Sequence, residues 1–409
     1  MTKKVILVWF RNDLRVQDNE ILSEAVNKAD ITIPVYFFDP RYFKTNDDGF
    51  QNTGILRTQF LIETVQALKH SLQELGADLL TFIGKPEDHL GTLCAKYDVT
   101  EVYHHREVAY RETQISERVE AALWEQKINL KHFIGHTLYH KEDLPIPIKD
   151  IPDNFAAFKK KVEKESFVRP TIDPIETIIT HPHLEHTQIA TLGELGYHED
   201  SSLDDKRIQG GERRALQTIA QTLSLNYSEI DDYNLVSPYI AVGAVSPIFY
   251  YHEIKAAYSP NKKKKYDQLI LRLMWRDYFR FMLKKYPNIF FKNHDVSTDV
   301  KNSIEVLQQW LTGQSEHPVI QDLKNQMQQI GNLPYAHREI LAAYMIQHLH
   351  VNHLSGARVF EEYFLDYAPA TVYGYWLHFA QKGTSLKDNL KTSWEELIKK
   401  NYKAHASIK

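Results

Sequence analysis

The stretch "KVILVWFRNDLRVQDNEIL", Lys4 to Leu22, decides the fold of the first part of the chain. Its first seven residues, Lys4 to Phe10, form a continuous apolar run, which is typical of a strand buried on both faces of a parallel sheet. A polar segment and then a stretch with helical spacing follow. Ligands of open α/β sheets gather at the carboxyl ends of the strands. Four charged residues stand there, as a ligand site or as a surface cluster of ion pairs: Arg11, Asp13, Arg15 and Asp18.

The same alternation continues to about residue 135. Four further strand-like runs follow, each separated from the next by a segment with helical spacing: "ITIPVYFFD" (31–39), "DLLTFIG" (78–84), "VTEVYHHRE" (99–107) and "INLKHFIG" (128–135). Strands that alternate with helices predict a doubly wound α/β domain with a parallel sheet over residues 1–135. No GxGxxG follows the first strand, so the standard dinucleotide fingerprint is absent.

Two changes of pattern divide the rest of the chain. Residues 136–204 are irregular and rich in proline, which indicates an interdomain linker. From 205 to 409 strand signals vanish and segments with a period of 3.6 residues predict an all-helical domain. Within it, "SPYIAVGAVSP" (Ser237 to Pro247) holds two Ser-Pro pairs, which predict two helix starts. Helix N-termini bind phosphate, although ordinary capping explains the same pairs.

Composition excludes several classes of protein. The formal net charge is -4, so any nucleic-acid site has to be a local patch. The single cysteine, Cys94, excludes internal disulfides, multi-cysteine zinc sites and four-cysteine iron–sulfur clusters. We expect no metal site, because His348 and His350 point about 200° apart on a helix. The start lacks a signal sequence and no apolar run reaches about 18 residues, so we expect a cytoplasmic protein without membrane spans. We also expect a monomer.

Two stretches combine aromatic and charged residues. "LRLMWRDYFRFMLKKYP" (Leu271 to Pro287) places Trp275 and several other rings beside Arg276 and Arg280, and "DYAPATVYGYW" runs from Asp366 to Trp376. Rings beside cations form stacking surfaces for bases or for a flat cofactor. Core packing with ion pairs on the outer face is the alternative.

Taken together with four further segments, these motifs resemble the photolyase/cryptochrome family. The likeness is strongest to its DASH branch and extends to about residue 395. It implies an antenna domain, a linker and a helical domain that holds FAD, with a folate-type antenna pigment and light-driven electron transfer to a pyrimidine dimer in DNA. The segments are "PVYFFDPRYF" (34–43), "LYHKEDLP" (138–145), "GGERRAL" (210–216) and "MWRDYFRF" (274–281).

The resemblance assigns roles to individual residues. Trp376 corresponds to the relay tryptophan nearest the flavin, Trp310 to the outermost one and Trp275 to the ring that meets the flipped-out dimer. Glu142 stands in the segment that contacts the antenna pigment, and the stretch from Asp366 to Trp376 corresponds to the loop at the flavin edge. The remaining cofactor-binding positions are Ser237, Gly243, Arg276, Arg338, Asp366 and Gly374, and Trp376 belongs with them as well.

Several positions of the flavin pocket depart from the family pattern. Val372 replaces an Asn that contacts flavin N5, and Ala368 replaces an acid at the imide edge. Arg272 replaces a Glu that contacts flavin and dimer, and His353 replaces the middle relay tryptophan. The pairs and runs around them differ too, at Tyr233-Asn234 and at Asn332 to Ala336. Because the departures gather in the pocket, they indicate altered function.

Three functions therefore stay open. The first is a DASH-type flavoprotein that repairs or binds pyrimidine dimers in single-stranded DNA under blue light, as a carbon–carbon lyase of the deoxyribodipyrimidine photolyase type. The second is a cryptochrome-like photosensor, for which Arg272 speaks. The third is a nucleic-acid or ligand-binding member without flavin photochemistry, for which Val372 and Ala368 speak.

Overall fold

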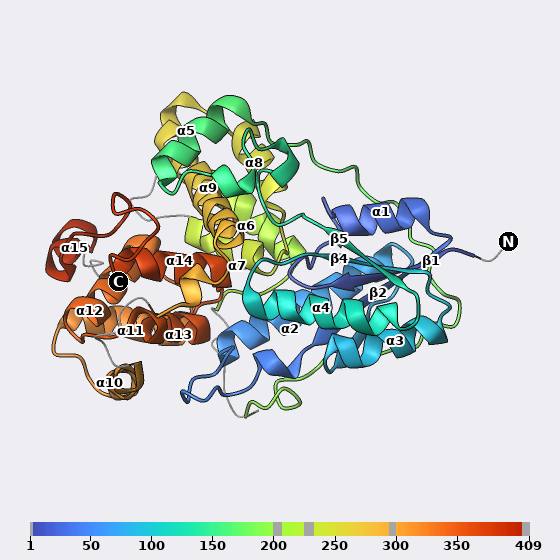
Figure 1. Ribbon diagram of the computed structural model, residues 1–409, viewed down its shortest axis with the longest axis horizontal. Coiled ribbons are helices and arrows are strands. Elements are labelled where there is room, and N and C mark those ends of the chain that lie inside the picture. Colours follow the sequence, from blue (N-terminus) through green and yellow to red (C-terminus); the bar gives the residue numbers. More distant parts are fainter. Residues whose placement is uncertain (1–2, 199–206, 225–232, 294–299, 403–409) are drawn as a thin grey trace.

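The computed structural model describes residues 3–198, 207–224, 233–293 and 300–402. Figure 1 shows a sheet with its helices at the amino-terminal end of the molecule and a mass of helices at the other. The sheet is parallel, with the strand order β3-β2-β1-β4-β5. This confirms the predicted doubly wound domain, and all five strands lie where the sequence placed them: β1 Val5–Phe10, β2 Ile31–Phe38, β3 Leu80–Ile83, β4 Glu101–His105 and β5 Asn129–Phe133.

Two hydrophobic cores cover the two faces of this sheet. Alternate residues of a strand point to opposite faces. The Val5, Leu7 and Trp9 side packs against α3 (Pro86–Lys96) and α4 (Tyr110–Trp124). The Ile6, Val8 and Phe10 side packs against α1 (Glu20–Lys28) and α2 (Ile55–Glu74), and its core continues into the helical domain. The two domains therefore share one hydrophobic core.

The predicted linker is more ordered than its composition suggested. Helix α5 (Phe155–Glu165) lies within it, as do the single turns η2 (Lys141–Asp143) and η3 (Ile148–Asp150). Asn154 caps α5 by accepting a hydrogen bond from the backbone N–H of Ala157 (3.1 Å). The apolar face of α5 packs on α9 (Lys263–Lys285), so this part of the linker covers the helical domain.

The helical domain contains several helices that the sequence predicted. Two others escaped prediction: α14 (Pro369–Phe379), taken for a loop, and α15 (Trp394–Asn401). The remaining helices of the described part are α6 (Glu212–Ser224), α7 (Tyr233–Ala241), α8 (Pro247–Ala256), α10 (Val300–Thr312), α11 (Pro318–Ile330), α12 (Tyr335–Gln347) and α13 (His353–Tyr363), with the short turns η1 (Pro40–Tyr42), η4 (Pro260–Lys262) and η5 (Ile289–Phe291).

Helix α9 joins the two halves of the molecule. The Asp277 carboxyl group accepts hydrogen bonds from the backbone N–H groups of Leu138 (3.0 Å) and Tyr139 (2.9 Å). Arg280 pairs with Glu107 (3.0 Å). Burial raises the pKa of Asp277 to about 7. The helix that carries Trp275 is thereby fixed to the segment that follows the sheet.

Candidate functional site

A cavity lies in the helical domain between α7, α9, α12 and α14, and we call it the inner cavity. It holds about 760 Å³ of space that no atom fills, part of it open to solvent. Its lining residues are Tyr233, Asn234, Ser237, Ile240, Ala241, Arg272, Arg276, Tyr335, Arg338, Phe360, Asp366, Ala368, Thr371, Val372, Tyr375 and Phe379.

A partly buried ion pair forms one wall of the inner cavity. Arg338 Nη1 donates to Asp366 Oδ1 (2.8 Å), and the Ser237 hydroxyl donates to Asp366 Oδ2 (2.6 Å). Arg338 also donates to the Leu333 carbonyl (2.7 Å) and to Asn332 Oδ1 (3.1 Å). A buried carboxylate needs such partners, since an unpaired charge away from water is costly. The structure thus brings together three residues that the sequence predicted for one site.

The inner cavity is rich in positive charge. Three arginines, Arg272, Arg276 and Arg338, line it. Among the described lining residues, Asp366 is the single acid. The Arg272 guanidinium lies 4.0 Å over the Tyr335 ring, a cation–π contact. Arg276 donates to the carbonyl of His136, and burial lowers the pKa of Arg276 to about 10. This excess of cations suits a polyanionic ligand.

Helix α14 supplies a second wall, in place of the loop that the sequence predicted. Residues 368, 371, 372, 375 and 379 line the cavity, which matches one face of a helix. Pro369 begins the helix at a position where its missing N–H costs nothing. The opposite face packs in the core, where a Cβ on Gly374 would collide with the Phe279 ring. Gly374 therefore serves packing and does not line the cavity.

The first predicted helix start is wrong. Ser237 and the following Pro238 lie inside α7 (Tyr233–Ala241), so Ser237 is not an N-cap residue. Proline leaves the carbonyl four residues earlier without its helical partner. Here that carbonyl, of Asn234, accepts from the Asn332 side chain (2.8 Å) and from the Ser237 hydroxyl (3.3 Å). The second start is confirmed: Ser246 caps α8 at the N–H groups of Ile248 (3.0 Å) and Phe249 (3.1 Å).

Gly243 lies at the seam between the domains and does not line the inner cavity. Its φ is +70°, and a Cβ there would collide with the backbone of Asn12. Its carbonyl accepts from Arg15 Nη1 (3.0 Å). Close packing of the two domains explains the glycine at this position, and the predicted role of Gly243 in cofactor binding stays a prediction.

The predicted relay residues are spread through the helical domain. Trp376 is fully buried against Phe360 and Phe379, which line the inner cavity, with ring centroids 5.0 and 6.0 Å away. Trp310 is buried in α10, where its ring lies 6.4 Å from Tyr344. Trp310 does not line the inner cavity.

A second, outer cavity adjoins the inner one and shares part of its wall. Trp275 lines it from α9, and the Phe155 ring of α5 stacks on the indole at 3.6 Å. Phe155 is buried and is absent from the lining, so it supports Trp275 from behind. The two cavities share Arg272, Tyr335, Tyr375 and Phe379; the outer one adds Trp275, Glu339, His378, Lys387, Asp388, Asn389, Leu390, Lys391 and Thr392.

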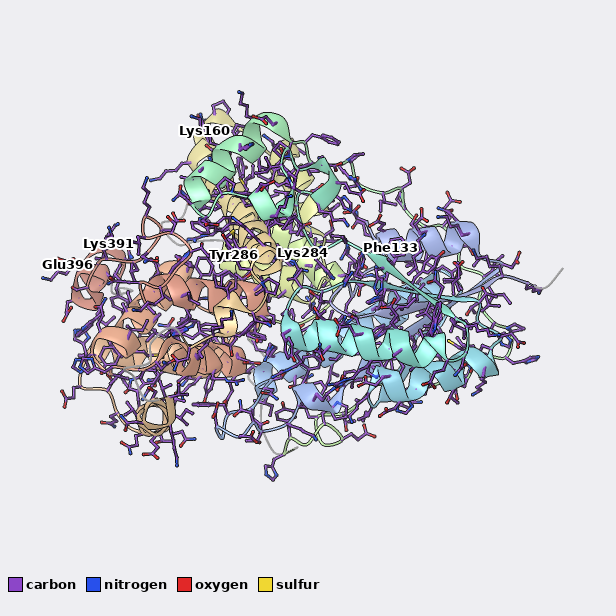
Figure 2. The ribbon with its side chains drawn as sticks, viewed as in Figure 1. Phe133, Lys160, Lys284, Tyr286, Lys391 and Glu396 are labelled. Carbon is purple, nitrogen blue, oxygen red and sulfur yellow. The ribbon has the colours of Figure 1, made fainter. Side chains whose placement is uncertain are left out.

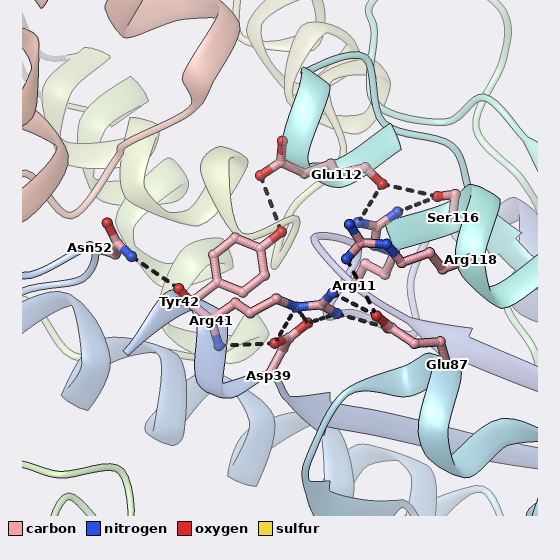
Figure 3. Close-up of polar contacts among 9 residues, drawn as sticks. All are labelled: Arg11, Asp39, Arg41, Tyr42, Asn52, Glu87, Glu112, Ser116 and Arg118. Carbon is pink, nitrogen blue, oxygen red and sulfur yellow. Dashed lines mark hydrogen bonds and ion pairs between the residues drawn. The ribbon is translucent and has the colours of Figure 1, made fainter. Parts of the chain in front are cut away.

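A third cavity lies at the carboxyl ends of β1 and β2, and we call it the sheet-edge cavity. Figure 3 shows the polar contacts around it, in which Arg41 bridges Asp39 (2.6 Å) and Glu87 (2.6 Å). The Tyr42 hydroxyl donates to Glu112 (3.1 Å). The charged residues of its lining are Arg11, Asp39, Arg57 and Glu112. Arg11 was predicted at such a ligand site, whereas Asp13 is buried against His105 (2.7 Å), Arg15 binds the Gly243 carbonyl and Asp18 binds Ser246.

Comparison with known proteins identifies this arrangement. Residues 6–177 match the sequence model of DNA photolyase, and residues 269–395 match that of the FAD binding domain of DNA photolyase. A Cryptochrome DASH from Gloeobacter violaceus is 32% identical over 95% of this chain and 81% of that protein. The chain belongs to the photolyase/cryptochrome family. The boundaries at residues 135 and 204 stay predictions.

Other relatives and solved structures agree. Cryptochrome DASH from Danio rerio is 32% identical over 95% of this chain and 79% of that protein. The crystal structure of the Synechocystis sp. PCC6803 cryptochrome superposes with a TM-score of 0.90 at 28% identity, over 98% of this chain and 87% of that one. This photolyase/cryptochrome chain is thus a flavoprotein of DASH type, and its helical domain is the family's FAD-binding domain.

The inner cavity contains polar atoms that fit a bound cofactor. Asn234 Oδ1 and Thr371 Oγ1 are buried and have no hydrogen-bond partner within the described part of the chain. Buried polar atoms normally have partners, so an unpartnered pair in a cavity wall indicates a ligand. Sequence analysis did not single out Thr371, and only its place beside Val372 pointed to it.

Two further predictions concern the surface and metals. Glu142 is an exposed residue of η2, 3.7 Å from His140, and lines none of the three cavities described above. No group of three or more His, Cys, Asp or Glu in the described ranges is arranged to hold a metal ion. Likewise, no helix within those ranges is long and apolar enough to cross a membrane.

Proposed function

We propose that this chain binds and repairs pyrimidine dimers in single-stranded DNA under blue light, as a carbon–carbon lyase. The observation that carries the proposal is the shared wall of the inner and outer cavities, formed by Arg272, Tyr335, Tyr375 and Phe379. A cofactor in the inner cavity and a base in the outer one would be neighbours. FAD supplies the light-driven electron that splits the dimer; the protein supplies position and charge.

The residues of this chain divide that work. Ser237, Arg338 and Asp366 fix the polar side of FAD, while Arg272 and Arg276 offer cations for its diphosphate. Trp275, supported from behind by Phe155, offers a ring for a flipped-out dimer. Trp376 and Trp310 are proposed as ends of the electron relay. Burial lowers the pKa of His378 to about 4, so this outer-cavity imidazole is neutral at pH 7.

A nucleic-acid strand needs positive charge around the outer cavity. Lys391 lines that cavity, and Lys387 joins it there. Figure 2 shows Lys391 in the segment before α15 (Trp394–Asn401), with Glu396 near it, while Lys160 of α5 and Lys284 of α9 lie at other places in the molecule. Lys387 and Lys391 thus place local positive charge at the outer cavity of a chain whose net charge is -4. This local charge supports the proposed binding of a DNA strand there.

Two places compete for an antenna pigment. The sequence predicts a folate at Glu142, which is exposed. The sheet-edge cavity is the stronger candidate, because Trp9, Phe10, Tyr36 and other rings line it beside Arg11 and Asp39. The crystal structure of an archaeal photolyase from Sulfolobus tokodaii, which holds two FAD molecules and implies a novel light-harvesting cofactor in that protein, shares the fold at 21% identity with a TM-score of 0.78 over 97% of this chain and 87% of that one.

A photosensor without repair is the second candidate, and Arg272 favours it. An acid that contacts the dimer in the family is replaced by a cation, which changes the recognition of a neutral base. Absorbance from about 350 to 500 nm and repair of a dimer-containing oligonucleotide under blue light decide between the two. Bound FAD with repair supports the first function, and bound FAD without repair supports the second. A protein that takes up no FAD on reconstitution contradicts both.

A further inference from the structure

The α14 wall of the inner cavity is apolar at two positions where the family resemblance implies polar groups. Ala368 and Val372 line the cavity with methyl groups, and Phe379 adds a ring. Thr371 is their polar neighbour on the same helix face, next to Val372 in the chain. Its hydroxyl oxygen is buried and has no hydrogen-bond partner among the residues that the structure describes.

An equivalent group belongs to α7. Asn234 is 9% exposed, and its side-chain oxygen is buried without a partner in the same described ranges. Its backbone carbonyl is already satisfied by the Asn332 side chain (2.8 Å). That contact holds the first turns of α7 in place, so the Asn234 amide has a fixed position in the wall. Two unsatisfied polar side chains therefore line one cavity from different helices.

Unsatisfied polar atoms in a core are costly, so they are rare. Here they coincide with the cavity from which other polar contacts are missing. We infer that Thr371 and Asn234 are cofactor-binding residues of this chain. They satisfy polar atoms of FAD in place of the groups absent at Val372 and Ala368. The inference rests on the proposed binding of FAD in the inner cavity.

The Thr371→Val substitution tests this directly, because it removes a hydroxyl and keeps the shape of the side chain. The chain offers a matched control. Thr222 of α6 also has a buried hydroxyl oxygen without a partner in the described ranges, and it lines none of the cavities described above. Both substitutions remove an unsatisfied polar atom from the apo protein, so neither lowers the Tm of that form.

The two variants separate when FAD is added. We expect Thr371→Val to weaken the Kd for FAD about five- to thirtyfold, as loss of a hydrogen bond to a buried ligand does. The rise of Tm on adding FAD shrinks accordingly. Thr222→Val keeps both within about twofold of the parent. Quenching of FAD fluorescence gives the Kd, and a thermal scan gives the Tm.

Asn234→Leu provides an independent second variant with a similar side-chain volume. It is expected to weaken FAD binding by a similar factor and to add to Thr371→Val, because the two groups come from different helices. FAD affinity that is unchanged in both variants, or lowered equally by Thr222→Val, overturns the inference while the proposed function stands. A parent protein that binds no FAD overturns the proposed function as well, and the two failures are thus distinguishable.

Discussion

The inner cavity and the sheet-edge cavity hold their charges in different ways. In the inner cavity, Asp366 is enclosed by Arg338 and Ser237, and two more arginines leave an excess of positive charge. In the sheet-edge cavity, two arginines face two acids. One of these acids, Glu112, forms no ion pair with any residue that the structure describes, and the Tyr42 hydroxyl donates to it.

The charge of each lining indicates which kind of ligand each cavity binds. A net positive wall with fixed donors matches a doubly charged diphosphate and stays costly until it is filled. A balanced wall lined by rings matches a planar ligand with little net charge. The FAD-binding domain and the α/β domain thus suit two kinds of ligand.

The largest effect is expected from Arg338→Ala. It leaves the partly buried Asp366 carboxylate without its cation. Removing one partner of a fully buried pair costs about 3–5 kcal/mol, so we expect a loss of stability somewhat below that range. The Kd for FAD is expected to weaken at least a hundredfold, because both the cation and its ordered carboxylate are lost. Urea unfolding and FAD fluorescence measure the two effects.

Arg57→Ala in the sheet-edge cavity is the matched comparison. Arg57 donates to the carbonyls of Asn52 and Glu361 (2.5 Å each) and forms no ion pair within the described ranges. Its loss strands no charge, so we expect a smaller loss of stability, about 1–3 kcal/mol, and unchanged FAD affinity. If Arg338→Ala and Arg57→Ala weakened FAD binding equally, the inner cavity would not be the specific site of FAD.

Arg272→Glu should have an intermediate effect, because it gives the inner cavity the balanced charge of the other one. With two arginines against two acids, FAD affinity is expected to fall about tenfold or more. Affinity for an oligo(dT) strand should fall as well, with a shallower salt dependence, if Arg272 also faces a phosphate. Titrations at several salt concentrations measure both.

Lys263→Glu controls for the change of charge, since Lys263 is an exposed residue at the start of the same helix, α9. It should leave the affinity for FAD unchanged. If the Arg272→Glu variant binds FAD as tightly as the parent does, the proposed role of Arg272 in FAD binding is wrong. If the variant loses affinity for the DNA strand but not for FAD, Arg272 acts in the outer cavity.

Sequence reasoning succeeded where burial leaves a simple pattern. Strands covered on both faces read as apolar runs, and all five were found. Helix α14 failed for a related reason: it is buried nearly all round, so its sequence shows no polar face with a period of 3.6. Gly374 and Pro369 added to the impression of a loop. Helix α5 carried a readable signal, with Asn154 as cap and Phe155, Phe158 and Val162 on one face, but prolines before it hid this signal.

The candidate site was predicted in part. Ser237, Arg276, Arg338 and Asp366 line one cavity as the family resemblance implied. Gly243 and Gly374 do not, because the need for glycine arises there from close packing of Asn12 and Phe279. Thr371 and Asn234 could not be found without the structure, since the absence of a hydrogen-bond partner is a property of the packed surroundings and not of the sequence.

The smallest effect concerns Glu112, the acid that forms no ion pair with the described residues. Burial, followed by the nearby charge of Glu107, raises the pKa of the Glu112 carboxyl group. A carboxyl group whose pKa is higher in the folded than in the unfolded protein destabilises the fold as pH rises above its ordinary value. Glu112→Gln removes this loss and keeps an acceptor for Tyr42.

The variant should therefore match the parent within about 1 kcal/mol near pH 4 and become the more stable of the two between pH 5 and 8. Urea unfolding across this range measures the difference. Glu117→Gln, at an exposed acid of the same helix, should run parallel to the parent. If the free energy of unfolding of Glu112→Gln also changed with pH as that of the parent does, the surroundings would stabilise the charge of Glu112 as Arg338 and Ser237 stabilise that of Asp366. The sheet-edge cavity would then be prepared for charge in the same way as the inner one.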